Sequence, residues 1–328
     1  MIALSKGQLT VWADMIGIPN LTLAEHDLRL THALAGLYGA PALKDILAFK
    51  GGTALNKIYF GKFSRLSVDL DFNLIGPPRE VVKQGAPVRK AIEAVLRDQD
   101  PGYEFKFSYR AQQTTLLARY APQSGGARQP LKIELSMRES VPILGLFEKS
   151  IPSPDASSPI KVKTYSIDEL LSTKIRALYE RKKGRDIFDL DCARLLELDR
   201  PAIRKLVYYY FYRSGKIFNW KVLRANLEAK AADKRFGDDI KPFLRPDISF
   251  DAPAAIRNFL AAFEFLGQPD ARDEEFLALA KRLAGRTKSV KKLARTSHLV
   301  HPLKTLMAPI PITAQAAALT VDDIRPEA

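Results

Sequence analysis

The sequence predicts an α+β protein in which a domain with a mixed β-sheet is followed by an all-helical domain. Segments with alternating apolar and polar residues, the pattern of half-buried strands, all lie in the first half of the chain. From Ser166 onward the apolar residues recur at helical spacing, and Glu169 follows Ser166 at the distance of a capping box. We therefore expect a core domain over residues 1–165, a helical domain over residues 166–304 and a tail rich in proline and alanine over residues 305–328.

The first half contains both periodicities, so helices and strands are expected to alternate there. The expected elements are a helix at 21–39, strands at 46–50 and 66–74 with a short helix at 56–60 between them, a helix at 81–98, strands at 103–110, 114–121 and 131–137, a surface loop at 150–160 and a brief strand at 161–166. Only short turns separate the three strands between residues 103 and 137. These strands are therefore expected to form an antiparallel meander.

The second half shows helical spacing almost throughout. One long helix is expected over 166–198, a second from Pro201, and others over about 218–231, 252–266 and 273–300. The run YYYFY at 208–212 is aromatic on every side of its helix, which favours a place in the core over base stacking. The segment 281–295 holds seven basic residues and no acid, so a contact with nucleic acid competes there with a solvated face.

The composition narrows the classes of function. The 328 residues are 46% hydrophobic and 27% charged, and the net charge of +14 favours a polyanionic partner such as nucleic acid. The single cysteine, Cys192, excludes a disulfide within the chain and argues against a cysteine-based zinc site. No apolar run reaches the length of a membrane span, and the N-terminus lacks a signal-peptide layout. We expect a cytoplasmic protein with no membrane partner.

Two aspartates occupy the expected strand 66–74. Asp69 and Asp71 are two residues apart, so they project from the same face while Leu70 and Phe72 project from the other. Neighbouring carboxylates repel one another, and a divalent cation such as Mg²⁺ removes that cost. The alternative is a pair of acids facing solvent, and the D-x-D pattern alone favours it.

Other residues give the two aspartates a context. Gly51, Gly52 and Thr53 follow a strand and precede a helical segment, where backbone N–H groups and the Thr53 hydroxyl can approach a phosphate. Glu134 points away from the apolar neighbours Ile133 and Leu135, as a third carboxylate of a two-metal site would. Taken singly, a turn and a solvated acid are the better explanations of these residues.

A cationic stripe is expected on the helix over 166–198. Lys174, Arg181 and Arg185 fall within about 40° of one another on a continuous helix, which suits a triphosphate or an RNA backbone. A helix break at Gly184 would weaken this argument for Arg185. A solvated helix face is the ordinary explanation of such a charge pattern.

Five segments together carry a family resemblance. They are KGGTAL at 50–55, RLSVDLDF at 65–72, IELSMRES at 133–140, YSIDELLSTKIRALYER at 165–181 and RDIFDL at 185–190. In this order and spacing the chain resembles the AbiEii/AbiGii toxin family of nucleotidyltransferases, within the DNA polymerase β-type superfamily. Fifteen residues separate Thr53 from Asp69, a gap that is long for the superfamily and usual for the toxin family.

The resemblance implies a polymerase β-like nucleotidyltransferase core and assigns roles to the matching residues. Asp69, Asp71 and the less uniform Glu134 would bind Mg²⁺, with two metal ions as the expected complement. Gly51, Gly52, Thr53, Lys174, Arg181 and Arg185 would bind the nucleotide, and Ser67 would contact phosphate or metal-bound water. Asp186 would be a base or a positioning group, with Asp189 as the second choice for that role.

The implied activity is that of a toxin in a toxin–antitoxin pair, of the abortive-infection type that acts in phage defence. An RNA 3′-hydroxyl, expected to be that of tRNA, would attack the α-phosphate of an NTP, and nucleotide addition would block translation. A cognate antitoxin encoded by an adjacent gene is the expected partner. Two alternatives stay open: nucleotidylation of a protein target, as in AMPylation, and a non-catalytic RNA-binding module.

Overall fold

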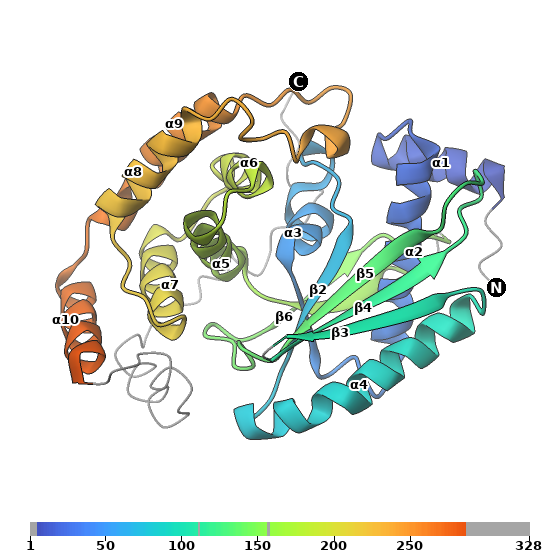
Figure 1. Cartoon of the computed structure of the whole chain (residues 1–328), viewed down its shortest axis with the longest axis horizontal. Helices are drawn as coiled ribbons and strands as arrows, with labels where there is room; N and C mark the ends of the chain where they lie inside the picture. Colours follow the sequence, from blue (N-terminus) through green and yellow to red (C-terminus); the bar gives the residue numbers. More distant parts are fainter. Residues whose placement is uncertain (1–4, 111, 156–157, 287–328) are drawn as a thin grey trace. The chain divides into compact units, whose positions relative to one another are not determined.

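The computed structural model describes residues 5–110, 112–155 and 158–286, and these divide into two compact units (Figure 1). Among the described residues, the first unit contains those up to Tyr165 together with Phe243–Ile248, and the second contains Ser166–Pro242 and residues 249–286. The sequence assigns residues 243–248 to the helical domain, but they join the first unit. The Leu66 N–H donates to the Phe243 carbonyl at 2.9 Å, and Arg245 Nε donates to the Ser64 carbonyl at 2.8 Å.

Some predictions fall on residues that the structure does not describe. The tail over 305–328, the end of the helix over 273–300 and most of the basic segment 281–295 lie outside the described residues. Within the described part of the chain, no helix is long and apolar enough to cross a membrane.

The first unit is built on a mixed sheet. Its elements are α1 Lys6–Ile16, α2 Leu21–Gly39, β1 Leu47–Lys50, α3 Gly51–Ala54, the π-helix η1 Leu55–Phe60, the 3-10 turn η2 Gly61–Phe63, β2 Asp69–Leu74, α4 Pro78–Gln99, β3 Glu104–Arg110, β4 Gln113–Tyr120, β5 Gln129–Ser136, β6 Phe147–Ile151 and β7 Ile160–Thr164. The described residues form one 7-stranded sheet in the order β3-β4-β5-β2-β1-β7-β6. The predicted α+β class with a mixed sheet is thereby confirmed.

The directions of β3, β4 and β5 confirm the predicted meander, and the other pairings were not predicted. β3, β4 and β5 pair antiparallel, as expected of a meander, whereas β2 runs parallel to β5 and β1 runs parallel to β7. β6 is a strand that the sequence prediction missed. It begins before the predicted loop at 150–160 and ends within it. It pairs antiparallel with β7 at the sheet edge.

The two faces of the sheet differ in composition. Leu116, Ala118, Ile133 and Leu70 are fully buried on the face against which α2 and α4 pack. The residues between them point to the other side and keep part of their surface accessible to solvent. We call this side the polar face. It carries Asp69 and Asp71 on β2, Lys132 and Glu134 on β5, Gln113, Thr115, Leu117 and Arg119 on β4, and Lys106, Ser108 and Arg110 on β3.

The second unit is helical in its described part. Its elements are α5 Ile167–Glu180, α6 Gly184–Ala193, α7 Arg200–Arg213, α8 Trp220–Ala231, the 3-10 turn η3 Lys241–Phe243, whose last residue belongs to the first unit, α9 Ala252–Ala262, the 3-10 turn η4 Glu264–Gly267 and α10 Ala271–Arg286. The Ser166 hydroxyl accepts from the Glu169 N–H at 3.2 Å and starts α5, as predicted. The aromatic residues Tyr208–Tyr212 of α7 are at most 3% exposed, which confirms their place in the core.

The single long helix predicted over 166–198 is wrong. α5 ends at Glu180, Arg181 has extended backbone angles, and α6 begins at Gly184. Lys174, Arg181 and Arg185 therefore do not share one helical face. The predicted cationic stripe therefore does not form on one helix. Any contacts of these three residues with a shared partner are tertiary contacts.

Candidate active site

The two aspartates stand on the polar face next to β5 and β1. In the register of the sheet, Asp71 lies opposite Glu134 on β5 and opposite Lys50 on β1, and Asp69 lies opposite Lys132. The parallel pairing of β2 with β5 is what brings Glu134 beside the aspartates. The sequence places each of these acids on the polar side of its strand, but only the register of the sheet makes them neighbours.

Lys132 is the residue that sequence reasoning missed. Its Nζ lies 2.6 Å from Glu134 Oε1 and 3.4 Å from Asp69 Oδ2. Burial lowers the pKa of Lys132, but these carboxylates together hold it above its usual range. Gln113 Nε2 also donates to Glu134 Oε2 at 2.8 Å. The alternation of β5 places Lys132 on the same side as Glu134, and this was the signal that could have found it. We call Asp69, Asp71, Glu134 and Lys132 the carboxylate cluster.

Asp71 is the carboxylate with the least favourable surroundings. Desolvation by burial raises its pKa first, the nearby Glu134 and Asp69 raise it further, and Lys50 and Lys132 oppose them. A carboxyl group with a raised pKa is under-compensated for negative charge. A bound cation would favour its ionised form.

The residues fit Mg²⁺ as a pair of ligands. Asp69 and Asp71 supply hard oxygen donors from one strand face, and Mg²⁺ is often held by one or two carboxylates plus substrate phosphates. In the described part of the chain no group of three or more His, Cys, Asp or Glu residues is arranged to hold a metal ion. Glu134, predicted as a third ligand, has both carboxylate oxygens engaged by Lys132 and Gln113.

A helix begins directly at the two glycines. α3 starts at Gly51 and continues without interruption into η1, and no side chain of the described residues caps its first N–H groups. Such groups at a helix start are free to bind an anion. Gly51 has φ +77°, and a Cβ at this position would overlap the Asp71 carboxylate. Only glycine therefore allows this strand-to-helix turn and the close approach of Asp71.

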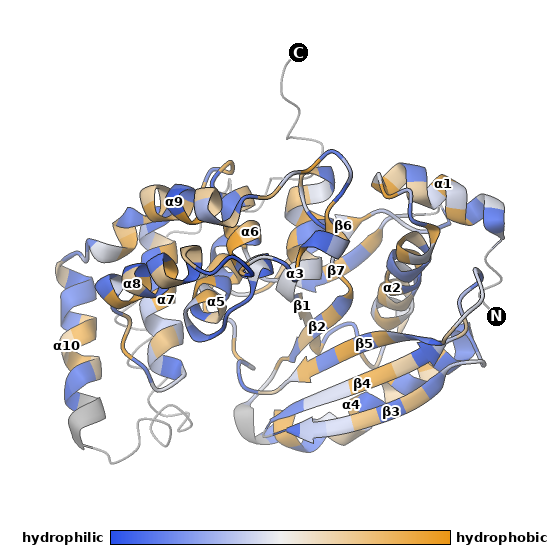
Figure 2. Cartoon of the chain, turned by 45° about the horizontal axis from the view of Figure 1, so that its top comes forward, coloured by the Kyte–Doolittle hydropathy of each residue, from blue (hydrophilic) through white to orange (hydrophobic). Residues whose placement is uncertain are grey.

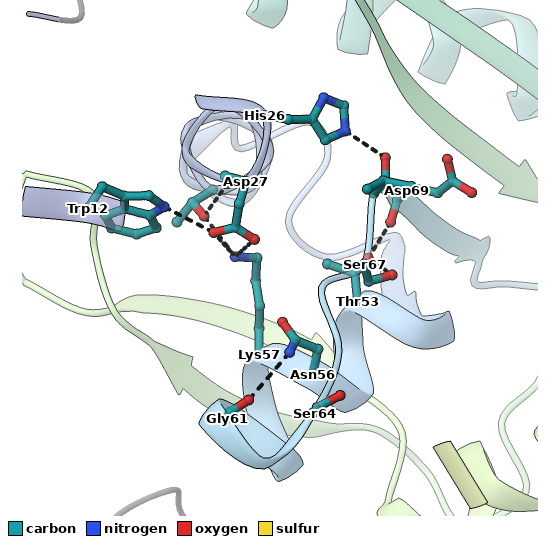
Figure 3. A network of polar contacts seen from close by, with 12 residues as sticks. Trp12, His26, Asp27, Thr53, Asn56, Lys57, Gly61, Ser64, Ser67 and Asp69 are labelled. Atoms are coloured by element: carbon teal, nitrogen blue, oxygen red, sulfur yellow. Dashed lines mark hydrogen bonds and ion pairs between the residues drawn. The ribbon is translucent and has the colours of Figure 1, made fainter. Parts of the chain in front are cut away.

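The hydroxyls of Thr53 and Ser67 hold β2 against the start of this helix. Thr53 is fully buried, its Oγ1 lies 2.8 Å from Ser67 Oγ, and it donates to the Asp69 carbonyl (Figure 3). His26 Nε2 lies 2.9 Å from the Val68 carbonyl, one residue before Asp69. These contacts fix the backbone of Asp69. They give Thr53 a structural use, and its direct contact with phosphate stays a prediction.

The long gap between Thr53 and Asp69 is filled by η1 and η2. Asn56 Nδ2 donates to the Arg65 carbonyl at 3.0 Å and so closes the loop that follows them. Lys57 Nζ donates to both oxygens of Asp27 at 2.9 and 3.0 Å, and Asp27 Oδ2 also accepts from Trp12 Nε1 at 3.1 Å (Figure 3). The inserted residues are thus tied to α1 and α2, which keeps the helix start in a fixed place.

The second unit contains its own group of predicted site residues. Lys174 of α5 is buried, with Nζ 2.8 Å from Asp189 Oδ2 and 3.4 Å from Asp186 Oδ1. Arg181 donates to Asp186 through Nε at 2.7 Å and through Nη2 at 2.8 Å, a bidentate pair. We call Lys174, Arg181, Asp186 and Asp189 the ion-pair cluster. Arg185 is half-buried on α6, and its Nε has no hydrogen-bond partner among the described residues.

The charge of Asp186 is strongly compensated. Its burial favours the neutral acid, but Lys174, the Arg181 hydrogen bonds and Arg185 together lower its pKa to about 2. A carboxylate with so low a pKa is a weak proton acceptor near neutral pH. Between the two predicted roles of Asp186, its surroundings therefore favour positioning over general base.

Lys230 of α8 supports the same region. It is buried, and its Nζ donates to the carbonyls of Leu178 and, at 2.9 Å, Arg181, where α5 ends. Burial lowers the pKa of Lys230 to about 8, while Asp186 opposes this shift. The sequence shows Lys230 only as one of several basic residues of its helix.

A carboxylate pair beside a glycine-started helix, on a mixed sheet, is the arrangement expected of a nucleotidyltransferase. The family model described as nucleotidyl transferase AbiEii toxin, type IV TA system, matches residues 32–266, and the chain therefore belongs to this family of toxin–antitoxin nucleotidyltransferases. The match extends from α2 through the first unit and into η4 of the second.

Solved structures share the fold. MenT4, a nucleotidyltransferase toxin from Mycobacterium tuberculosis H37Rv, is 20% identical with a TM-score of 0.60, and the match covers 90% of this chain and 100% of that one. JHP933 from Helicobacter pylori is 15% identical with a TM-score of 0.50, over 80% of this chain and 97% of that one. No curated protein sequence matches the chain.

Proposed function

We propose that this nucleotidyltransferase uses Mg²⁺ to transfer a nucleoside monophosphate from an NTP to the 3′ end of an RNA, with the acceptor end of tRNA as substrate. The observation that carries the proposal is the carboxylate pair Asp69 and Asp71 beside the uncapped helix start at Gly51. The net charge of +14 supports an RNA partner. Blocking the tRNA acceptor end would stop translation, which agrees with membership of a toxin family.

Different residues of the first unit would bind the phosphates and the metal ion. The N–H groups of Gly51 and Gly52 would hold the NTP phosphates, and Asp69 and Asp71 would hold the metal ion. When bound, Mg²⁺ supplies charge stabilisation for the attacking and leaving oxygens. The RNA 3′-hydroxyl loses its proton to solvent and its oxygen bonds to the α-phosphorus. The bond from the α-phosphorus to the bridging oxygen breaks, and pyrophosphate leaves with the electron pair.

Residues outside the carboxylate pair would orient rather than react. Thr53, Ser67 and His26 keep Asp69 in place, and Glu134 keeps Lys132 beside it. In the second unit Lys174 would bind the NTP phosphates, and Asp186 would position Arg181 for the same purpose. A cognate antitoxin and a cytoplasmic site of action complete the proposal.

Transfer of label from α-³²P-NTPs tests the proposal. Purified protein is incubated with total RNA and each labelled NTP, with Mg²⁺ or with EDTA, and label is followed in RNA and in protein. We expect label in the tRNA fraction with Mg²⁺ only. We expect none from Asp69→Asn, and we expect a loss from Lys174→Ala. Lys83→Ala, at an exposed position of α4, is the control and should label normally.

The same experiment separates the alternatives. Label that appears in protein would replace the RNA substrate by a protein hydroxyl. Toxicity in cells that survives both Asp69→Asn and Lys174→Ala, with both variants folded by circular dichroism, would contradict a transferase mechanism.

A further inference from the structure

The polar face continues beyond the carboxylate cluster to the edge of the sheet. The register places Asp69, Lys132, Leu117 and Lys106 in one row across β2, β5, β4 and β3. A parallel row runs from Asp71 to Ser108, and the next row ends at Arg110. Three strand spacings of about 4.8 Å separate the aspartates from β3, so these edge residues lie about 14 Å from the carboxylates.

The far end of the polar face has cations that form no ion pair with a described residue. Lys106 and Arg110 are exposed on β3, and Arg119 is half-buried on β4. None of their side chains forms an ion pair with another residue in the described ranges of the chain. Glu104 is the one acid in the sequences of these two strands, and it is paired with Arg128 at 3.3 Å. This end of the polar face therefore has an uncompensated positive charge.

The chemistry of the surface suits a nucleic-acid backbone. Ser108, Thr115 and Gln113 lie among the cations, and hydroxyl, amide and cationic groups are the side chains that contact phosphate and sugar. Aromatic anchors, which a protein partner would use, point the other way. Phe107 and Tyr109 project from the opposite face, where Arg89 of α4 covers the Phe107 ring at 4.2 Å. Figure 2 shows this alternation of hydrophilic and hydrophobic residues along β3.

We propose that Lys106 and Arg110, with Arg119, bind the sugar–phosphate backbone of the acceptor RNA on the 5′ side of its reacting 3′ end. This inference rests on the proposed function, because an acceptor whose 3′-hydroxyl meets Asp69 and Asp71 needs a surface for the nucleotides before it. The polar face is that surface within the first unit. The negative aspartates and the positive strand edge then bind different parts of the same complex, the metal with its NTP and the RNA backbone.

A matched pair of double variants tests the proposal. Lys106→Ala/Arg110→Ala removes two cations from the polar face, and Lys83→Ala/Lys90→Ala removes two exposed cations from α4, which packs against the other face. Affinity for unfractionated tRNA is measured in full-length protein without NTP over a range of salt concentrations. We expect about tenfold weaker binding and a slope of log K against log salt reduced by about 1.4–1.8 for the first variant only.

Transfer kinetics complete the test. The KM for RNA should rise by a similar factor in Lys106→Ala/Arg110→Ala, while the KM for NTP and the kcat at saturating RNA stay unchanged. Equal RNA affinity in both double variants, while the unmodified protein labels RNA, would overturn this inference and leave the proposed function standing. Normal RNA affinity with lost neutralisation by the antitoxin would assign the surface to a protein. Failure of the unmodified protein to label RNA would overturn both proposals.

Discussion

In the first unit three carboxylates gather around Lys132 on a partly exposed sheet face, whereas in the second unit two buried carboxylates face Lys174 and Arg181. The difference in compensation is visible in the pKa values. The pKa of Asp71 is raised by burial and by its acidic neighbours, and that of Asp186 is lowered to about 2 by its cations. The carboxylate cluster is short of positive charge, and the ion-pair cluster is balanced.

The comparison indicates which cluster is arranged to receive a cation. A group of acids short of positive charge gains stability when a cation binds, whereas a balanced group is already satisfied within the fold. We therefore expect substitutions in the carboxylate cluster to change activity more than stability. Substitutions in the ion-pair cluster are expected to change stability as well.

The largest expected effect is that of Asp71→Asn. Loss of one proposed metal ligand should lower nucleotide transfer by about 10³-fold or more, about 4 kcal/mol of barrier at 1.36 kcal/mol per factor of ten. Asparagine removes a carboxylate charge that its surroundings do not favour, so the midpoint of thermal unfolding should be equal or higher. Transfer assays and calorimetry on the same preparation measure both. A variant that loses activity only because it unfolds would break the comparison.

Lys174→Met tests the other side of the comparison. It leaves Asp186 and Asp189 buried without their shared lysine, and breaking a buried ion pair costs about 3–5 kcal/mol. Urea denaturation should show this loss at pH 7. The loss should shrink as the pH falls toward the pKa of Asp186, because that carboxyl then takes up a proton in the folded state. The double variant Lys174→Met/Asp189→Asn should recover part of the stability, and a fully stable Lys174→Met would show that the cluster is not balanced as described.

Gly51→Ala sharpens the geometric side of the argument. The new methyl group meets the Asp71 carboxylate, and alanine disfavours the φ of +77°. We expect transfer to fall about 10²-fold, because a displaced Asp71 no longer aligns metal and phosphate. Gly39→Ala is the matched control, since a Cβ there meets nothing within 4 Å. Equal activity of the two variants would remove Gly51 from the site.

Local patterns predicted most of the elements but few of the contacts between them. The alternation of β2 and β5 correctly placed Asp69, Asp71 and Glu134 on polar sides. The parallel register that joins them depends on the whole chain, so the ion pairs of Lys132 could not be read from either strand. The same limit applies to the residues before β2 and to residues 243–248, where the contact of Arg245 with Ser64 has no local signal.

The errors have particular physical reasons. The helix over 166–198 was predicted as continuous because its apolar spacing persists, but the chain leaves the helical conformation at Arg181, and Lys230 binds the carbonyls at that end. The break matters for function. It turns Arg181 back onto Asp186 and makes a bidentate pair where the sequence predicts a stripe.

The smallest expected effect is that of Lys132→Met, and it tests whether Lys132 supplies the positive charge that a metal ion would otherwise supply. Its Nζ lies within 3.4 Å of both Asp69 and Glu134, so removing it leaves the acids less compensated. The side chain is about one-third exposed, and solvent therefore weakens the interaction. We expect Mg²⁺ to bind about tenfold more tightly, seen by calorimetry and as a larger rise in unfolding temperature on addition of Mg²⁺. Lys106→Met, in the same row but about 14 Å from Asp69, should leave Mg²⁺ affinity unchanged. Weaker Mg²⁺ binding in Lys132→Met would instead mean that the lysine holds Asp69 and Glu134 in the geometry that the metal needs.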